Sequence, residues 1–440
     1  MMQLGTQSVG PDGHLTIGGC DVTELAATYG TPLYVLDEAH LRACARAYRD
    51  ALAAHCKRSK AYYASKALST TAVAAIVASE GLGLDVASGG ELLTALAGGA
   101  PAEDLMLHGN FKSPDEMRLA LAKGVGRICV DNIDEIRAWQ ALAEEMDVRP
   151  RILLRANPNV KPKTHTSIQT GQLDSKFGLS ILSGAAMAAV DVALSCDRLE
   201  LAGLHCHIGS QVLGWQAFAQ AAGEVADFLA AIRDKHGVVL DEIDLGGGLG
   251  IRYLPEHQPP SIAEFVGHVV EALLAGLAKH GLPEPLVMME PGRSLVGEAG
   301  TTIYTVGPVK VIPDVRTYVS VDGGLSDNPR PEMYGAEYNV FIANRAADTP
   351  DTTVTVSGKH CETDTLFRDV TLAAPRSGDL LAVQSTGAYN YAMASNYNRL
   401  PRPAMVTVAD GQAELVVRRE TAEDLLSCDL LPTRLQAGCE

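Results

Sequence analysis

The sequence predicts an α/β protein with a closed (β/α)8 barrel (a TIM barrel), followed by an antiparallel β domain that the N-terminal strands join. Two observations predict the barrel: short apolar runs recur between residues 61 and 294, and helical patterns lie between them. A third observation predicts the β domain, because after residue 300 the runs alternate and are rich in Thr, Val and Tyr. An open doubly wound sheet is the alternative for the first part of the chain.

Each apolar run is too short for a buried helix and ends in polar or glycine residues, which favours buried parallel strands. The runs are AYYAS (61–65), LGLDVAS (82–88), DLMLHGN (104–110), RICVDN (127–132), RILLRANP (151–158), LAGLHCHIGS (201–210), EIDLGGGLG (242–250) and LVMMEPGRS (286–294). Among the helical patterns, SPDEMRLALAKG (113–124) opens with a typical start signal. Eight strand–helix units over about 240 residues indicate one closed barrel.

The remaining runs define the other parts of the chain. HLTIGG (14–19) and PLYVLD (32–37) are expected to add strands to the β domain, in which VADGQA (408–413) carries an Asp-Gly hairpin signal. We therefore expect N-terminal strands over residues 1–37, the barrel over 38–300 and the β domain over 301–440. One long segment, 159–178, interrupts the barrel and is expected to be a lid or a binding loop.

The composition argues against several classes of protein. The formal net charge is −17, from 36 basic and 53 acidic residues, which disfavours nucleic acid or an anionic membrane as the main partner. The nine cysteines include no C-x-x-C pair, so a disulfide scaffold or a zinc site is not expected, and a reducing cytoplasm fits. We see no signal peptide and no apolar stretch long enough to span a membrane.

Chemically active residues follow the predicted strands, where the active site of a (β/α)8 barrel is built. Lys66 follows the first strand and would point into the barrel mouth, although alone it could be a solvated surface lysine. A lysine in the mouth could form a Schiff base with a carbonyl substrate or with pyridoxal phosphate. The other strand ends carry Asp85, His108, Asn110, Asp131, Asn132, Arg155, Asn157, His207, Ser210, the glycines at 246–248, Glu290 and Arg293.

Pyridoxal phosphate needs three supports, and separate strand ends offer a candidate for each. LGGGLG (245–250) and PGR (291–293) could present backbone N–H groups to the phosphate, although a glycine turn alone is common. Glu290 could keep the ring nitrogen protonated, so that the ring can accept electrons. His207 could stack on the ring, although a lone histidine is more often a packed core residue. The combination favours a cofactor site; His205 and Cys206 are interpreted as structural.

Several motifs occur together along nearly the whole chain. They are YYASKA (62–67), HCHIGSQ (205–211), GGGLG (246–250), EPGRSLV (290–296), CETDTL (361–366), TGAY (386–389), YGTPLYVLD (29–37), THTSIQTGQLDSKFG (164–178), DNPRPEMYGA (327–336), SNYNRLPRP (395–403) and RRETAEDLL (418–426). In combination they resemble the fold-type III pyridoxal-phosphate decarboxylases, most closely the diaminopimelate decarboxylases. The resemblance implies decarboxylation of meso-2,6-diaminopimelate to L-lysine, the last step of lysine biosynthesis, in a homodimer with active sites at its interface.

The resemblance also implies roles for individual residues. Lys66 would bond the cofactor, His207 would stack on its ring and Glu290 would face the ring nitrogen. Cys361 would donate a proton, although alone it reads as an inert buried thiol. The other implied cofactor-binding residues are Asp85, Ser210, Gly247, Gly248, Gly292, Arg293 and Tyr389. The implied substrate-binding residues are Arg293, Arg330, Tyr334, Glu362 and Tyr389.

Arg330 indicates which of the substrates used by fold-type III decarboxylases this chain would bind. Diaminopimelate keeps an intact amino-acid group at its far end, so binding there needs both signs of charge, whereas ornithine has no far carboxylate. Arginine offers a bidentate fork for that carboxylate, and Glu362 could pair with the ammonium. The alternatives are a sister decarboxylase acting on another α-amino acid, carboxynorspermidine-like or from secondary metabolism, a racemase with a tyrosine base, and a relative without catalysis.

Overall fold

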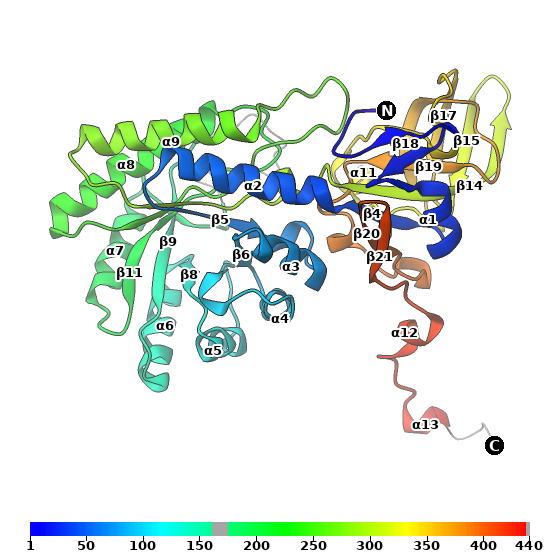
Figure 1. Ribbon diagram of the computed structural model, residues 1–440. Coiled ribbons are helices and arrows are strands. Elements are labelled where there is room, and N and C mark those ends of the chain that lie inside the picture. Colours follow the sequence, from blue (N-terminus) through cyan, green and yellow to red (C-terminus); the bar gives the residue numbers. More distant parts are fainter. Residues whose placement is uncertain (161–174, 437–440) are drawn as a thin grey trace.

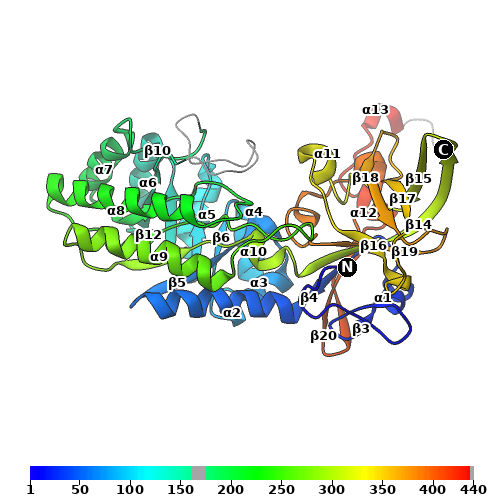
Figure 2. The same cartoon turned by 90° about the horizontal axis from the view of Figure 1, so that it is seen from above.

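The computed structural model describes residues 1–160 and 175–436, and a closed parallel barrel lies beside a mixed β domain (Figure 1; Figure 2). The barrel strands are β5 (Ser59–Ala64), β6 (Gly83–Val86), β7 (Leu105–Leu107), β8 (Arg127–Val130), β9 (Arg151–Asn157), β11 (Glu200–His205), β12 (Glu242–Asp244) and β13 (Leu286–Met289). Neighbours pair in parallel, and the β8–β9 pairing closes the ring. The barrel is therefore confirmed, and the open doubly wound alternative is wrong.

Helices cover the outside of the barrel (Figure 1). They are α2 (Glu38–His55), α3 (Thr71–Ser79), α4 (Gly89–Ala97), α5 (Pro114–Lys123), α6 (Ile133–Met146), α7 (Ala185–Ser195), α8 (Gln216–His236) and α9 (Ile262–Lys279). Capping boxes at Ser113 and Ser261 start α5 and α9. The interior is filled by a buried cluster of Tyr62, Met106, Cys129, Leu153, Ala202 and Met288. The barrel is thus a packed core, and its site lies at the strand ends.

The long strand β14 (Gly300–Ile312) organises the β domain. It pairs antiparallel with β4 (Leu33–Asp37), β15 (Arg316–Val321) and β19 (Leu380–Gln384). The domain also contains β16 (Val340–Ile342), β17 (Thr352–Ser357), β18 (Thr365–Leu372), β20 (Ala404–Ala409) and β21 (Gln412–Val417). The β15–β17 and β4–β20 pairings are parallel, so the sheet is mixed and not wholly antiparallel. The β20–β21 hairpin turns at Asp410 and Gly411, with φ of 49° and 75°, as its Asp-Gly signal predicts.

The two N-terminal runs join the β domain in different ways. β4 is a strand of the large sheet, between β14 and β20. In contrast, β2 (Leu15–Ile17) pairs with β1 (Ser8–Val9) and β3 (Cys20–Asp21) in a separate three-stranded sheet. The side chains of Leu15 and Ile17 are buried in one cluster with Leu33 and Val406 of the large sheet. This run therefore joins the β domain by packing and not by strand pairing.

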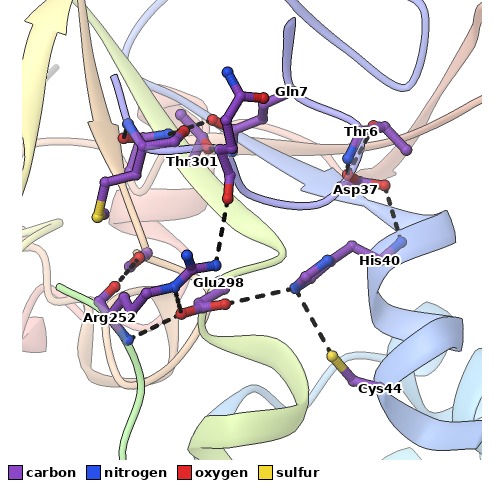
Figure 3. Close-up of polar contacts among 12 residues, drawn as sticks. Thr6, Gln7, Asp37, His40, Cys44, Arg252, Glu298 and Thr301 are labelled. Carbon is purple, nitrogen blue, oxygen red and sulfur yellow. Dashed lines mark hydrogen bonds and ion pairs between the residues drawn. The ribbon is translucent and has the colours of Figure 1, made fainter. Parts of the chain in front are cut away.

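Polar contacts fix the N-terminal segment where the barrel meets the β domain (Figure 3). The Asp37 carboxylate accepts hydrogen bonds from the backbone N–H of Thr6 at 2.7 Å and of His40 at 3.0 Å, the latter at the start of α2. Glu298, beyond the last barrel strand, accepts a hydrogen bond from the backbone N–H of Arg252 at 2.9 Å and lies 4.0 Å from His40 Nε2. These contacts hold four separate parts of the chain together, around Thr6, Asp37, Arg252 and Glu298.

Candidate active site

Lys66 lies in the barrel mouth, in a single 3-10 turn (Ser65–Ala67) that directly follows β5. Its Nζ lies 3.9 Å from Oδ2 of Asp85, which stands in the neighbouring strand β6. The side chain is 49% exposed, so a small molecule entering the mouth can reach it. Desolvation lowers the pKa of Lys66, but Asp85, Tyr389 and Glu290 together raise it above its ordinary value. The structure therefore places a cationic lysine against a buried carboxylate.

Glu290 follows β13 and lies between two histidines on the floor of the mouth. His108 Nε2 lies 2.6 Å from Oε1, and His205 Nε2 lies 3.1 Å from Oε2. The imidazole rings meet edge to face, with 4.9 Å between their centres. Burial raises the pKa of Glu290, but the two histidines lower it, and the net shift is well below the ordinary value. Glu290 is therefore an ionised carboxylate, and His205, interpreted from the sequence as structural, contacts it.

Two more carboxylates lie close to Glu290. Burial, and then the charge of Glu290, raise the pKa of Asp244 well above its ordinary value. Burial also raises the pKa of Asp85 to about 6, aided by Glu290 and opposed by His108 and Lys66. Because like charges cannot all ionise in one buried site, Glu290 holds the negative charge and Asp244 stays neutral.

The glycines after β12 form a cradle that fits a phosphate group. A Cβ on Gly247 would lie 2.0 Å from the carbonyl oxygen of Glu290, and one on Gly248 would lie 2.1 Å from that of Gly209, so side chains do not fit. Gly247 and Gly292 are buried, yet their backbone N–H groups donate no hydrogen bond to any described residue. Buried donors without partners are unfavourable, and a bound phosphate would satisfy them. The cradle therefore fits the phosphate of pyridoxal phosphate.

His207 lies beside this cradle and near Lys66. A Cβ on Gly246 would lie 3.1 Å from its Nδ1, so the absence of a side chain at position 246 leaves room for the ring. Burial, and then the positive charge of Lys66, lower the pKa of His207 well below its ordinary value. The ring is therefore a neutral, flat surface, as stacking on a pyridine ring requires.

Arg293 connects the cradle to the β domain. Its Nη2 donates a hydrogen bond to Ser210 Oγ at 3.1 Å, its Nη1 donates to the Tyr253 hydroxyl, and its guanidinium carbon lies 4.7 Å from the ring centre of Tyr389. The backbone N–H of Tyr389 donates to the carbonyl of Ala67 at 2.8 Å, which ties the β domain to the residue after Lys66. Sequence reasoning missed Tyr253, since it lies in a loop well past the end of β12.

Arg330 begins the short helix α11 (Arg330–Tyr334) and is 7% exposed. Its guanidinium carbon lies 5.3 Å from the ring centre of Tyr253 and 5.9 Å from those of Tyr334 and Tyr389. Its Nε has no hydrogen-bond partner, and no carboxylate in residues 1–160 or 175–436 forms an ion pair with it. A buried cation surrounded by tyrosines is suited to an anionic ligand.

Cys361 and Glu362 lie elsewhere, in the exposed loop between β17 and β18. The Cys361 thiol is therefore exposed and not buried. The Cys361 N–H donates to Asn398 Oδ1 at 2.8 Å, and Glu362 Oε1 accepts from the Tyr397 hydroxyl at 2.5 Å. Among the described contacts, no hydrogen bond or ion pair joins these two residues to Lys66 or Glu290. Within residues 1–160 and 175–436, one copy of the chain therefore shows no polar contact between the two sets.

The long loop of residues 159–178 falls mostly outside the described residues, since 161–174 are not described. At its described end, the guanidinium carbon of Arg155 lies 4.5 Å from the ring centre of Phe177. Arg155 stands in β9, so this end of the loop lies against a barrel strand near the mouth.

The sequence of this chain is similar to those of known decarboxylases. Residues 38–297 match the family model of the pyridoxal-binding domain of the pyridoxal-dependent decarboxylases. The chain is 46% identical over 431 residues to the diaminopimelate decarboxylase of Bacillus subtilis, covering 98% of each protein. It is 44% identical over 429 residues to that of Mycobacterium tuberculosis, covering 95% of each.

The fold of this chain is also similar to solved structures of diaminopimelate decarboxylases. The diaminopimelate decarboxylase of M. jannaschii, in complex with L-lysine, superposes with a TM-score of 0.90 at 34% identity, covering 98% of this chain and 99% of that one. The enzyme of Helicobacter pylori, also complexed with L-lysine, has a TM-score of 0.85 at 29% identity, covering 92% and 98%. Since the family model spans more than half of the chain and the relatives match nearly all of it, the chain belongs to the pyridoxal-dependent decarboxylases, in the family of the diaminopimelate decarboxylases.

Proposed function

We propose that this protein decarboxylates meso-2,6-diaminopimelate to L-lysine and CO2, the last step of lysine biosynthesis, with pyridoxal 5'-phosphate as its cofactor. The observation that carries the proposal is the buried Arg330 guanidinium, which has no anionic partner in the described chain. Ornithine or lysine as substrate would leave this cation without a carboxylate, whereas the far end of diaminopimelate supplies one. The full-length relatives, some solved with L-lysine bound, support the same substrate.

Different residues in the barrel mouth hold different parts of the cofactor. Bound pyridoxal phosphate supplies an electron sink for the electron pair that departing CO2 leaves behind. Lys66 is the amine that holds it covalently, and Asp85 keeps that amine in place. The free N–H groups of Gly247 and Gly292, with Gly248, Ser210 and Arg293, hold the phosphate. His207 packs on the ring, and the negative charge of Glu290 keeps a proton on the ring nitrogen.

A second group of residues holds the substrate. Arg330, with Arg293, Tyr334 and Tyr389, binds the far carboxylate, and Glu362 binds the far ammonium. Cys361 delivers a proton to the carbon that has lost CO2, which fixes the face on which the proton arrives. This assignment needs the loop with Cys361 and Glu362 to reach a barrel mouth.

We infer that a second copy of the chain brings that loop into place, in a homodimer with active sites at its interface. Cys361 and Glu362 are exposed, and among the described residues of one chain no hydrogen bond or ion pair connects them to Lys66. Mixing inactive Lys66→Ala protein with inactive Cys361→Ala protein should restore about a quarter of the wild-type rate, because random exchange gives mixed dimers in which one of two sites is intact. Lysine formation after subunit exchange measures this.

The control for the mixing experiment is each inactive variant exchanged with itself, which should restore nothing. No recovery in the mixed sample, despite exchange shown by mass spectrometry, would place Cys361 in the same copy as Lys66. A monomer in analytical ultracentrifugation would contradict the dimer itself.

We further propose that the protein works in the cytoplasm. All eight cysteines in the described residues are free thiols, as a reducing compartment favours. Within residues 1–160 and 175–436, none of the helices has the length and apolar character that crossing a membrane requires.

The first test of the function uses the purified protein with pyridoxal phosphate. Lysine and CO2 are followed after addition of meso-diaminopimelate, with L-ornithine, L-arginine and L-lysine in parallel. We expect lysine to form from diaminopimelate and no turnover of the other three. Cofactor binding without turnover of any of the four would contradict the substrate assignment and would point to a sister decarboxylase.

A further inference from the structure

Two buried histidines of the barrel mouth have no part in the proposed function so far. His108 follows β7 and is 6% exposed, and His205 ends β11 and is 1% exposed. Each directs its Nε2 to a different oxygen of Glu290, at 2.6 Å and 3.1 Å. His205 is hydrogen-bonded to Oε2, whereas His108 Nε2 lies close to Oε1 without hydrogen-bond geometry, so two strands of the barrel reach the same carboxylate.

The Glu290 carboxylate can accept a further hydrogen bond. An ionised carboxylate offers about four lone pairs, so the one hydrogen bond from His205 leaves both oxygens able to accept a further donor, with His108 beside Oε1. His205 Nδ1 is buried and has no partner in the described chain, which fits a neutral ring with its hydrogen on Nε2. The same Nε2–H then fixes the direction in which the carboxylate points.

The residues around Glu290 explain why its carboxylate has to be held in one direction. One side-chain atom each of His205, Asp244 and Glu290 lies within 4.8 Å of the others, and His108 Nε2 is also 3.8 Å from Asp85 Oδ1. Asp85, Asp244 and Glu290 therefore lie close together at the bottom of the barrel mouth. A proton placed on Glu290 would remove the negative charge that the ring nitrogen of the cofactor needs. The hydrogen bond from His205 to Oε2 and the His108 ring beside Oε1 favour the ionised form of Glu290 over those of its neighbours.

We propose that His108 and His205 are positioning residues that aim the Glu290 carboxylate at the cofactor's ring nitrogen and keep it ionised. The proposal rests on the proposed function, because it assigns Glu290 to that nitrogen. It adds a role for two buried residues that the proposed function leaves without one.

The test removes the Nε2–H donor and then restores a similar one. His205→Leu should lower kcat for lysine formation by about 10- to 100-fold with little change in KM. A Glu290 carboxylate that no longer points at the ring nitrogen would slow decarboxylation but would not change substrate binding. His205→Gln, whose amide nitrogen can occupy nearly the same place as Nε2, should recover most of this loss. The same pair of substitutions is made at His108, which keeps the test open if one histidine variant does not fold.

The decisive comparison is made in the Glu290→Gln background. If the histidines act through Glu290, His205→Leu should there cost less than about 3-fold, since its target is already lost. The absorbance spectrum of the bound cofactor, which reports protonation of its ring, should shift in the same direction in His205→Leu and in Glu290→Gln. His268→Gln, an exposed histidine of α9 stacked on Trp215, should match the wild type in both readouts.

Three outcomes would overturn the proposal. They are an equal loss from His205→Leu in both backgrounds, no rescue by glutamine at either histidine, or an unchanged cofactor spectrum in the leucine variants. Failure of the proposed function has a different signature. In that case the wild-type protein binds pyridoxal phosphate but does not turn over diaminopimelate, and the spectra still decide whether the histidines control the ring.

Discussion

Replacement of Lys66 by alanine is expected to lower kcat for lysine formation by at least about 10³-fold, because the site loses the amine proposed to bond the cofactor carbonyl. Among the described residues, no other lysine amine forms an ion pair with Asp85 in the barrel mouth. Free pyridoxal phosphate could still occupy the glycine cradle, so we expect weakened cofactor binding and not its complete loss. Single-turnover formation of lysine, with cofactor content measured on the same sample, checks both parts.

The same strand provides a matched control. Lys60 stands near the start of β5, at the other end of the barrel, and pairs with Asp104 at 3.0 Å. Because that end of a barrel serves stability and not catalysis, Lys60→Ala should keep kcat within about 2-fold of the wild type. A Lys66→Ala protein that kept more than a tenth of the wild-type rate would show that another group holds the cofactor.

The fold was predictable because its signal is local. Parallel strands covered on both faces read as continuous apolar runs, so AYYAS and LVMMEPGRS indicated buried strands without any knowledge of their partners. Closure of the barrel then brings strand ends together, which is why Lys66, Asp85 and Glu290 were expected in one mouth. In the β domain, alternation indicated strands but not their neighbours. The parallel β15–β17 pairing and the separate sheet of β2 therefore could not be read from the sequence.

The contacts inside the mouth were less predictable. His108 and Glu290 stand at the ends of different strands, and their 2.6 Å contact depends on side-chain directions that strand ends do not specify. Tyr253 is brought to Arg293 by a loop that carries no recognisable pattern. Cys361 could be assigned from resemblance only, because among the described residues no hydrogen bond or ion pair joins it to Lys66 or Glu290.

Substitution of Arg330 by methionine is expected to raise KM for meso-diaminopimelate by about 100-fold, with a smaller effect on kcat. A bidentate charged hydrogen bond to the far carboxylate would be lost, and this bond exists before and during the reaction alike. Initial rates over a range of meso-diaminopimelate concentrations measure KM and kcat.

Thermal unfolding separates this binding role from a structural one. In the ligand-free protein Arg330 is a buried cation without an acidic partner in the described residues, and such a charge is unfavourable for folding. Arg330→Met should therefore keep or raise Tm while KM rises, a trade of stability for binding that is typical of functional sites. Arg368→Met, which removes an exposed charge from β18 of the same domain, should change neither KM nor Tm. A fall in Tm together with an unchanged KM would instead make Arg330 a structural residue of the β domain and would remove the main reason for preferring diaminopimelate.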